Sequence, residues 1–238
     1  MISLTLAAAM SASAAAAAWY LGPMLPRRIE ERRLRQLCSE TRSLVLTYDD
    51  GPGATLTPRL LDLLQRRGAR ATFFLAGNCA NEHPQIVDAI AAGGHEIACH
   101  SQDHINAWWS WPWRGVTDIN AGYQTLAPWV EKNGLFRPPH GKMTLATWAA
   151  VRRRQAPIGW WTIVAGDVED EMPDSDLAVE QARRLGGGVV LLHDFDREPE
   201  RADFVLKSTT KLLDAAQQEG WTIRTLGELM CDGTKNAA

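Results

Sequence analysis

The chain has 238 residues, of which 45% are hydrophobic and 22% are charged, and its formal net charge is −3. A chain of this size buries about 70% of its unfolded surface in one core, so we expect one folded domain and no disordered chain. The near balance of charge argues against nucleic acid as a partner. The cysteines lack the close spacing of a zinc ribbon and indicate reduced thiols; they are Cys38, Cys79, Cys99 and Cys231.

The N-terminal segment, residues 1–40, begins with an uncharged run at residues 1–25 that is long enough to cross a bilayer. It could be an uncleaved membrane anchor, a signal peptide, or an apolar helix packed on the domain, and the lack of a basic start argues against the signal peptide. Five arginines and two glutamates follow between Arg27 and Arg35. By the positive-inside rule, we expect membrane association with residues 41–238 facing the cytoplasm. The alternative is export to the periplasm or cell surface.

Short apolar runs alternate with amphipathic segments from Leu44 onward, and Gly or Pro marks the connections. This alternation is typical of an α/β fold. The predicted strands are residues 44–47, 71–75, 96–99, 135–137, 158–163, 188–192 and 221–224. Seven strands indicate a β/α barrel that is one unit short of the usual eight.

Proline and glycine mark the ends of three expected helices. One begins at Pro58 and ends at Gly68, the next runs from Pro84 to Gly93, and a long last helix ends at Gly220. Each has an apolar stripe that we expect in the core. These stripes are Leu60, Leu61 and Leu64; Ile86, Val87 and Ile90; and Val205, Thr209, Leu212 and Ala216.

Polar residues cluster where the predicted strands end, and in a β/α barrel those ends build the active site. The first strand runs into Asp49 and Asp50, which precede Gly51 and Pro52. Adjacent side chains of an extended chain point in opposite directions, so one carboxylate could bind a metal ion while the other handles a proton. A turn with a helix cap is the structural alternative.

The third strand ends at His100, and His104 follows four residues later. We expect both on one face of a helical turn, where a single metal ion can take two imidazoles. Surface or capping histidines are the alternative. A carboxylate from another strand end would bring the count to three ligands and leave an open position, as catalytic zinc requires.

The fourth strand leads into the turn at residues 136–141, where paired prolines fix the backbone and Gly141 permits a close turn. Such a turn can hold a backbone N–H where an oxyanion develops. Arg137 could pair with a nearby carboxylate, or it could be a plain surface arginine.

His193 ends the sixth strand and is a good general acid. Asp167, which follows the fifth strand, could orient and charge this imidazole. A strand-end core histidine is the alternative.

The chain resembles the NodB-homology polysaccharide deacetylases, carbohydrate esterase family 4, in four motifs that occur in the same order: TYDDGP, HSQDH, FRPPHG and LLHD. The similarity covers roughly residues 42–230. It implies a distorted (β/α)7 barrel that hydrolyses N-acetyl or O-acetyl groups on sugars with a divalent metal. That metal is commonly Zn²⁺, with Co²⁺, Ni²⁺ or Mn²⁺ as alternatives.

The resemblance also implies roles for individual residues. Asp50, His100 and His104 would bind the metal, and Asp49, paired with Arg137, would be the base that activates its water. Ser101 would steady the metal-binding loop, the backbone N–H of His140 would be the oxyanion donor, Leu191 would line the acetyl pocket, and His193 would protonate the leaving amine. The expected substrate-binding residues are Ser101, Pro139, His140, Gly141, Leu191, Trp108 and Trp109.

The chain departs from the family pattern at two places. The family often has Asp-x-x-Asp-Trp after its fifth strand, whereas residues 164–168 read Val-Ala-Gly-Asp-Val. Asp167 is kept, but the first Asp and the Trp are absent. His140 replaces a usual Tyr. Hydrolysis stays the expectation, while the substrate preference is harder to infer.

Four tryptophans stand close together after the second metal-ligand candidate: Trp108, Trp109, Trp111 and Trp113. Burial in the core explains some of them. The alternative is exposure at the rim of the cleft, where an indole can stack on a sugar ring or lie in a membrane interface.

We therefore expect a metal-dependent N-deacetylase that acts on a cell-envelope polysaccharide or on a lipid-linked amino sugar, with no obligate protein partner. A close variant is deformylation of an undecaprenyl-linked amino sugar. Two other classes are a non-catalytic carbohydrate-binding barrel, which the intact acids and histidines argue against, and a non-haem iron oxygenase, which also uses two histidines and a carboxylate. In an oxygenase the base, the oxyanion turn and the acid would have no purpose.

Overall fold

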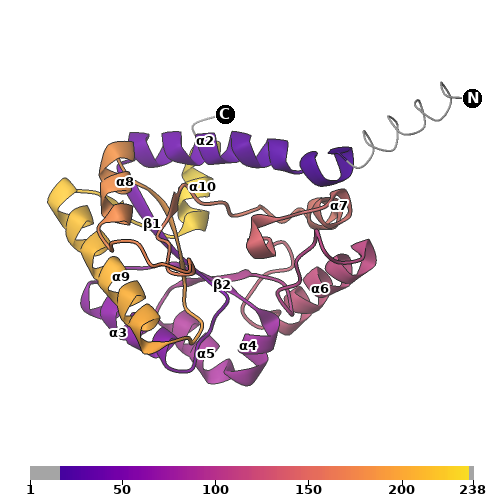
Figure 1. Cartoon of the computed structure of the whole chain (residues 1–238), viewed down its shortest axis with the longest axis horizontal. Coiled ribbons are helices and arrows are strands. Elements are labelled where there is room, and N and C mark those ends of the chain that lie inside the picture. The colour runs from indigo at the N-terminus through magenta and orange to yellow at the C-terminus, as the bar shows by residue number, and fades with distance from the viewer. Residues whose placement is uncertain (1–16, 236–238) are drawn as a thin grey trace, which may run out of the picture.

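The centre of the protein is a sheet of parallel strands, seen in a computed structural model that describes residues 17–235 (Figure 1). The strand order is β3-β2-β1-β5-β4, and β6 also pairs with β1. Their bounds are β1 Ser43–Asp49, β2 Thr72–Leu75, β3 Glu96–Cys99, β4 Ile163–Val164, β5 Gly188–His193 and β6 Thr222–Ile223. All seven residues of β1 are buried, as expected for a parallel strand covered on both faces.

Two isolated bridges close this sheet into a barrel. Cys99 bridges to Phe136, and Phe136 bridges to Ile158, which lies in the same extended segment as β4. The predicted strand at residues 135–137 is therefore reduced to the two bridges of Phe136, and only Ile163 of the strand predicted at residues 158–163 lies in a regular strand. The ladder ends there because Pro138 has no N–H to donate to the carbonyl oxygen of Gly159, and this oxygen instead accepts a hydrogen bond from Arg137 Nε at 2.9 Å.

Helices surround the barrel, and α2 runs along one side of the molecule (Figure 1). Their bounds are α2 Met24–Glu40, α3 Leu56–Arg66, α4 Gly77–Glu82, α5 Pro84–Ala92, α6 Pro112–Thr125, α7 Leu145–Arg153, α8 Leu177–Leu185, α9 Pro199–Glu219 and α10 Leu226–Lys235. The three predicted helices are α3, α5 and α9. All the members of their apolar stripes are buried except Leu61, which is partly buried.

The predicted start of α3 at Pro58 is wrong by two residues. The helix begins at Leu56 because the carboxylate of Asp196 accepts hydrogen bonds from the backbone N–H groups of Thr55 and Leu56. A residue that is distant in the sequence thus satisfies the first donors of the helix. The end of α9 is as predicted, since Gly220 follows it in the left-handed conformation with φ 65°.

Helix α2 packs on the barrel through Leu34, Leu37 and Cys38, which are buried in the common core. The core therefore includes residues on the N-terminal side of residue 41. Within residues 17–235, no helix has the length and apolar character that crossing a membrane requires. Most of the anchor predicted at residues 1–25 lies outside the described residues.

Candidate active site

Asp49, the last residue of β1, forms a buried ion pair. Arg137 Nη1 donates to Asp49 Oδ1 at 2.7 Å and to Thr47 Oγ1 at 2.7 Å. The Arg137 side chain is fully buried, and its guanidinium lies 3.9 Å from the centroid of the Phe74 ring. A buried charge needs such a partner, because removing it would leave the other charge uncompensated. The geometry thus pairs Arg137 with Asp49 and excludes a surface arginine.

Sequence reasoning missed Thr47 and Phe74, although the alternation of side chains along a strand could have found the first. Thr47 lies two residues before Asp49 and so shares its face of β1. Phe74 pairs with Asp49 in the parallel register of β1 and β2, which places it on the same face.

Asp50, His100 and His104 converge on one point. One ligand atom from each residue lies within 4.8 Å of the others. Asp50 Oδ1 is 3.2 Å from His100 Nε2 and 3.1 Å from His104 Nε2. This oxygen is buried and has no hydrogen bond of good geometry to any described residue. Two imidazoles and a carboxylate that leave such an atom unsatisfied suit a divalent cation such as zinc.

Electrostatics favour the ionised form of Asp50. Burial alone would raise the pKa of Asp50, but the close imidazoles of His100 and His104 outweigh it and hold the pKa well below its usual range. His100 Nδ1 lies 2.8 Å from the backbone oxygen of Arg137. When Nδ1 donates this hydrogen bond, the lone pair of Nε2 faces the cluster, as a metal-binding histidine requires.

The helical turn predicted for His100 and His104 is wrong, because residues 100–104 form an irregular loop. Ser101 and His104 have positive φ angles of 68° and 53°. Asp118 on α6 holds the loop, since its carboxylate accepts hydrogen bonds from the N–H of Asp103 at 2.8 Å and of Ile105 at 3.4 Å. The loop thereby brings both imidazoles to one point without a helix.

Sequence reasoning missed Asp118, and the signal was a charged residue on the apolar face of a helix. It is buried together with Gly115, Ile119 and Gly122. Ser101, predicted to steady the same loop, is also buried, and its Oγ has no hydrogen-bond partner among the described residues.

The predicted oxyanion turn is a single turn of 3-10 helix at Pro139–Gly141. His140 has φ 55°, and the centroid of its ring is 4.4 Å from that of His104, so the turn borders the cluster. A Cβ atom on Gly141, where φ is 63°, would lie 2.7 Å from the Trp161 ring. The close turn therefore needs glycine.

His193 ends β5 beside Asp49, with which it pairs in the parallel register. Asp167 Oδ2 accepts the backbone N–H of His193 at 2.8 Å and lies 3.2 Å from its Nδ1. Burial lowers the pKa of His193, but the hydrogen bond and the charge of Asp167 outweigh it and raise the pKa to about 9. Leu191, two residues earlier and paired with Thr47, faces the barrel interior below His193.

Asp194 is a further buried acid that sequence reasoning missed. Its Oδ2 accepts a hydrogen bond from Thr57 Oγ1 at 2.6 Å, and its backbone oxygen accepts one from Gly53 at 3.1 Å. Burial raises its pKa to about 7. A Cβ on Gly51 would meet this carboxylate at 2.2 Å, so Asp194 packs directly on the turn that follows Asp50. The pattern gave no signal for this role beyond its place after His193.

The tryptophans divide into one packed and three exposed side chains. Trp108 is partly buried, and its Nε1 donates to the backbone oxygen of Met143 at 3.0 Å. Trp109, Trp111 and Trp113 are 84%, 66% and 62% exposed. Burial in the core therefore accounts for Trp108 in part and for none of the other three.

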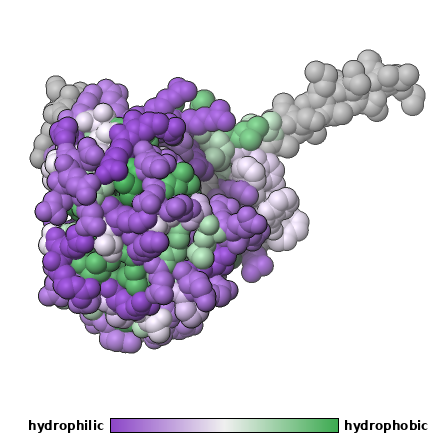
Figure 2. Space-filling view, turned by 60° about the vertical axis from the view of Figure 1, so that its left-hand side comes forward, coloured by the Kyte–Doolittle hydropathy of each residue, from purple (hydrophilic) through white to green (hydrophobic). Residues whose placement is uncertain are grey.

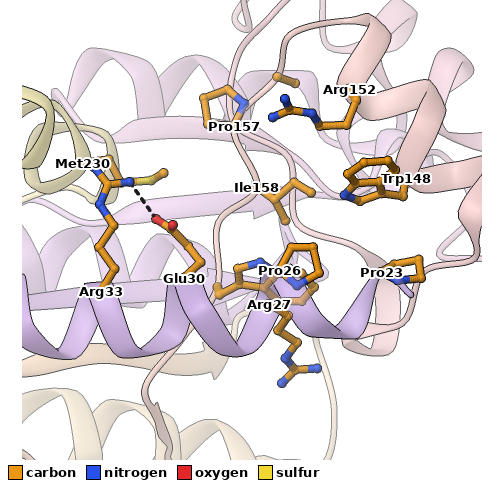
Figure 3. Close-up of a pocket in the computed structure, with 12 residues that line it drawn as sticks. Pro23, Pro26, Arg27, Glu30, Arg33, Trp148, Arg152, Pro157, Ile158 and Met230 are labelled. Carbon is orange, nitrogen blue, oxygen red and sulfur yellow. Dashed lines mark hydrogen bonds and ion pairs between the residues drawn. The ribbon is translucent and has the colours of Figure 1, made fainter. Parts of the chain in front are cut away.

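A cavity of about 230 Å³ lies away from the cluster, between α2, α7 and the start of α10 (Figure 3). Arg33 and Glu30 pair beside it, while the guanidinium of Arg27 turns away from Pro157 and Arg152. Arg27 Nη1 instead donates to the backbone oxygen of Gly141 at 2.9 Å. Helix α2 thus contacts the turn that borders the active site.

Comparisons with known proteins agree with this geometry. The model of a family described as polysaccharide deacetylase matches residues 36–157. A peptidoglycan-N-acetylglucosamine deacetylase of Bacillus cereus is 30% identical over 79% of this chain and 87% of its own length. A chitooligosaccharide deacetylase of Bradyrhizobium is 28% identical over 80% of this chain and 92% of its own. The solved structure of a family 4 carbohydrate esterase from Streptomyces lividans is 26% identical, with a TM-score of 0.63 over 75% of this chain and 89% of its own.

Proposed function

The chain belongs to the polysaccharide deacetylase family, and we propose on this basis that it removes N-acetyl groups from the amino sugars of a cell-envelope polysaccharide. The observation that carries the proposal is the meeting of three groups at one rim of the barrel. These are the cluster of Asp50, His100 and His104, the carboxylate of Asp49 held by Arg137, and the imidazole of His193 held by Asp167. Amide hydrolysis needs a metal or oxyanion site, a base and an acid in this arrangement.

Asp50, His100 and His104 would hold the metal, which we propose to be Zn²⁺. A bound divalent cation supplies a water of lowered pKa and polarises the acetyl carbonyl. Three protein ligands leave open coordination positions for the water and for the carbonyl oxygen. The set contains no thiolate, so Co²⁺, Ni²⁺ and Mn²⁺ are the alternatives to test beside zinc.

Asp49 and His193 divide the proton transfers. We assign the base to Asp49, because Arg137 Nη1 fixes one of its oxygens at 2.7 Å and leaves the other for the water. We assign the acid to His193, because Asp167 keeps its imidazole protonated at neutral pH, ready to donate to the departing amine nitrogen. The backbone N–H of His140 would stabilise the oxyanion, and Leu191 would contact the acetyl methyl group.

The test is release of acetate from N-acetylated chitooligosaccharide and peptidoglycan by the zinc-loaded protein. Asp49→Asn should reduce the rate roughly 100-fold or more, since it removes the base. The matched control is Asp62→Asn, an exposed acid on α3, which should leave the rate unchanged. If no divalent metal gives acetate release from either substrate, the proposal is wrong and a carbohydrate-binding barrel becomes the better interpretation.

A lipid-linked amino sugar is the second candidate substrate, and the position of the tryptophans favours it. Lys142, two residues after His140, lies with its Nζ 5.0 Å from the centroid of the Trp108 ring, so the loop that carries the exposed indoles contacts the chain just after the turn at His140. Mass spectrometry of lipid-linked sugars before and after incubation would show loss of an acetyl or a formyl group. Loss of formyl alone would identify a deformylase.

A further inference from the structure

Exposed apolar side chains gather at the corner where residues 17–29 meet the loop before α6. We call this surface the apolar corner; it consists of Tyr20, Leu21, Leu25, Ile29, Trp109, Trp111 and Trp113. Its two halves adjoin, because the rings of Tyr20 and Trp108 pack edge to face with centroids 5.8 Å apart. Figure 2 shows hydrophobic surface where the described chain begins. Such a patch on one corner indicates an interaction site.

The helical half of the corner faces away from the barrel. Leu25 and Ile29 are 65% and 61% exposed and lie one turn apart on α2. The helix packs on the barrel with Leu34 and Leu37, which helical spacing places on the opposite side. Packing of α2 on the barrel therefore leaves these two aliphatic side chains uncovered.

Unpaired positive charge lies beside them on the same helix. Arg28, Arg32 and Arg35 are exposed, and no ion pair or hydrogen bond joins them to any residue that the structure describes. The nearby carboxylates form ion pairs with other arginines, since Glu31 pairs with Arg27 at 2.7 Å and Glu30 pairs with Arg33 at 3.3 Å. The outer face of α2 therefore combines aliphatic residues with three arginines that have no counter-charge within residues 17–235.

The loop half of the corner is aromatic. Trp111 and Trp113 stack on each other with ring centroids 5.0 Å apart, and Trp109 is 84% exposed beside them. Indoles favour the interface between lipid headgroups and acyl chains, where the ring is partly dehydrated and the N–H stays wet.

We propose that the apolar corner docks onto the surface of an anionic lipid bilayer. An amphipathic helix with exposed apolar residues and free arginines is the pattern that binds such an interface. A glycan would stack on the tryptophans, but it would gain nothing from Leu25, Ile29 and the arginines. A second copy of the chain would bring the same three arginines against themselves if it used the same face. Docking of the apolar corner on a bilayer does not depend on the proposed reaction, so vesicle binding is measured without substrate.

The first experiment uses the full chain with vesicles that contain phosphatidylglycerol and a brominated lipid, which quenches tryptophan fluorescence inside the bilayer. Wild type should be quenched, and Trp109→Phe/Trp111→Phe/Trp113→Phe should lose that quenching while it still sediments with the vesicles. Anchoring by residues 1–16 alone would give sedimentation without quenching in wild type, and it would overturn the proposal. Equal quenching in the triple variant would also overturn it.

The second experiment tests the charge. Arg28→Gln/Arg32→Gln/Arg35→Gln should weaken partitioning to anionic vesicles, by about fivefold for each arginine, and leave partitioning to neutral vesicles unchanged. The matched control is Met172→Ala/Leu177→Ala, which removes exposed apolar side chains from another face and should change nothing. Equal binding of the arginine variant and wild type would contradict a role for these charges.

Sedimentation velocity tests whether a second copy of the chain occupies the corner instead. If wild type is a dimer that does not bind vesicles, and the tryptophan variant is a monomer, the corner is assigned to a second copy.

Discussion

Asp167 determines the charge of His193 in this site. The imidazole is largely buried, which alone would lower its pKa, yet the carboxylate 3.2 Å from Nδ1 raises the pKa to about 9. The folded pKa exceeds the ordinary value of about 6.5. The charged imidazole therefore stabilises the fold fully below that ordinary value, and this contribution is lost as the pH rises through about 9.

Asp167→Asn should move the alkaline limb of the kcat/KM profile to lower pH by about one to two units, because the imidazole loses its ionic partner. The activity at pH 6, where His193 stays protonated in both proteins, should fall much less than the activity at pH 8. The measurement is kcat/KM for acetate release from chitooligosaccharide across this pH range. An unchanged alkaline limb would show that another group is the acid.

The residues that sequence reasoning placed in the site are those at the ends of strands. Asp49 and His193 could be placed because parallel strands deliver their carboxyl ends to the same rim of a barrel. Asp118 and Asp194 could not, because each acts through backbone groups that only the folded loops bring near. Such contacts depend on tertiary distances: the helical pattern can mark Asp118 as a charge on a buried face, but it does not say which backbone groups its carboxylate meets.

At the scale of elements, contacts that a sequence pattern does not reveal also explain why β5 was predicted correctly and the fourth strand was not. The apolar run at residues 188–192 predicted β5 with a difference of one residue at its end. The run at residues 135–137 looked similar, but Pro138 cannot donate to the carbonyl of Gly159, which accepts from Arg137 instead, and only the two bridges of Phe136 remain. An apolar run predicts where a strand can form, while the backbone donors that follow it determine whether its ladder continues.

Helix α6 positions the loop that carries His100 and His104, the proposed metal ligands, through a close approach at Gly122. A Cβ atom there would lie 2.4 to 2.8 Å from backbone atoms of Ser101, which cannot move without shifting the loop between His100 and His104. Gly122→Ala should therefore lower the free energy of unfolding by about 1–3 kcal/mol and weaken zinc binding. Urea denaturation and a zinc titration measure the two effects.

The matched control is Gly115→Ala on the same helix. A Cβ there would lie 2.9 Å from the methyl group of Thr147 on α7 and within 4 Å of no backbone atom in residues 100–104, so any loss of stability would arise away from His100 and His104. Zinc affinity should then stay at the wild-type value. Equal loss of zinc affinity in both variants would show that α6 acts only through general stability.

Helix α2 acts on the oxyanion turn through Arg27. Its guanidinium donates to the backbone oxygen of Gly141 and lies 4.8 Å from the centroid of the Trp161 ring. Arg27→Ala should lower kcat/KM on a soluble oligosaccharide about tenfold, because small displacements of a turn at the reacting centre are costly. The matched control is Arg28→Ala, because Arg28 is the next residue and has no side-chain partner among the described residues. Its kcat/KM should equal that of wild type. A fall in melting temperature with unchanged kcat/KM would limit Arg27 to a structural role.

At the scale of the whole molecule, the barrel gathers charged groups at one rim and leaves Asp50 with a buried oxygen that has no well-aligned donor among the described residues. Burial disfavours the charge of His100, but Asp49 and Asp50 outweigh it and raise the pKa of this imidazole above its ordinary value. Protons therefore compete with a metal for this site, and metal binding should release them. The buried oxygen of Asp50 costs the fold free energy, and a bound cation would relieve this cost.

Zinc should raise the thermal stability of the whole domain, since it binds the folded rim and not the dispersed ligands of the unfolded chain. At 100 times its dissociation constant, the gain is about 2.7 kcal/mol. Differential scanning fluorimetry with zinc or with a chelator measures it, and the gain should grow as the pH rises, because the His100 imidazole, whose pKa is raised, must lose its proton to bind the metal. His104→Gln should abolish most of the shift, whereas His83→Gln, a histidine between α4 and α5, should keep it. A shift of equal size in both variants would place the stabilising zinc at another site, and the cluster at the barrel rim would then lose its assignment as the metal centre.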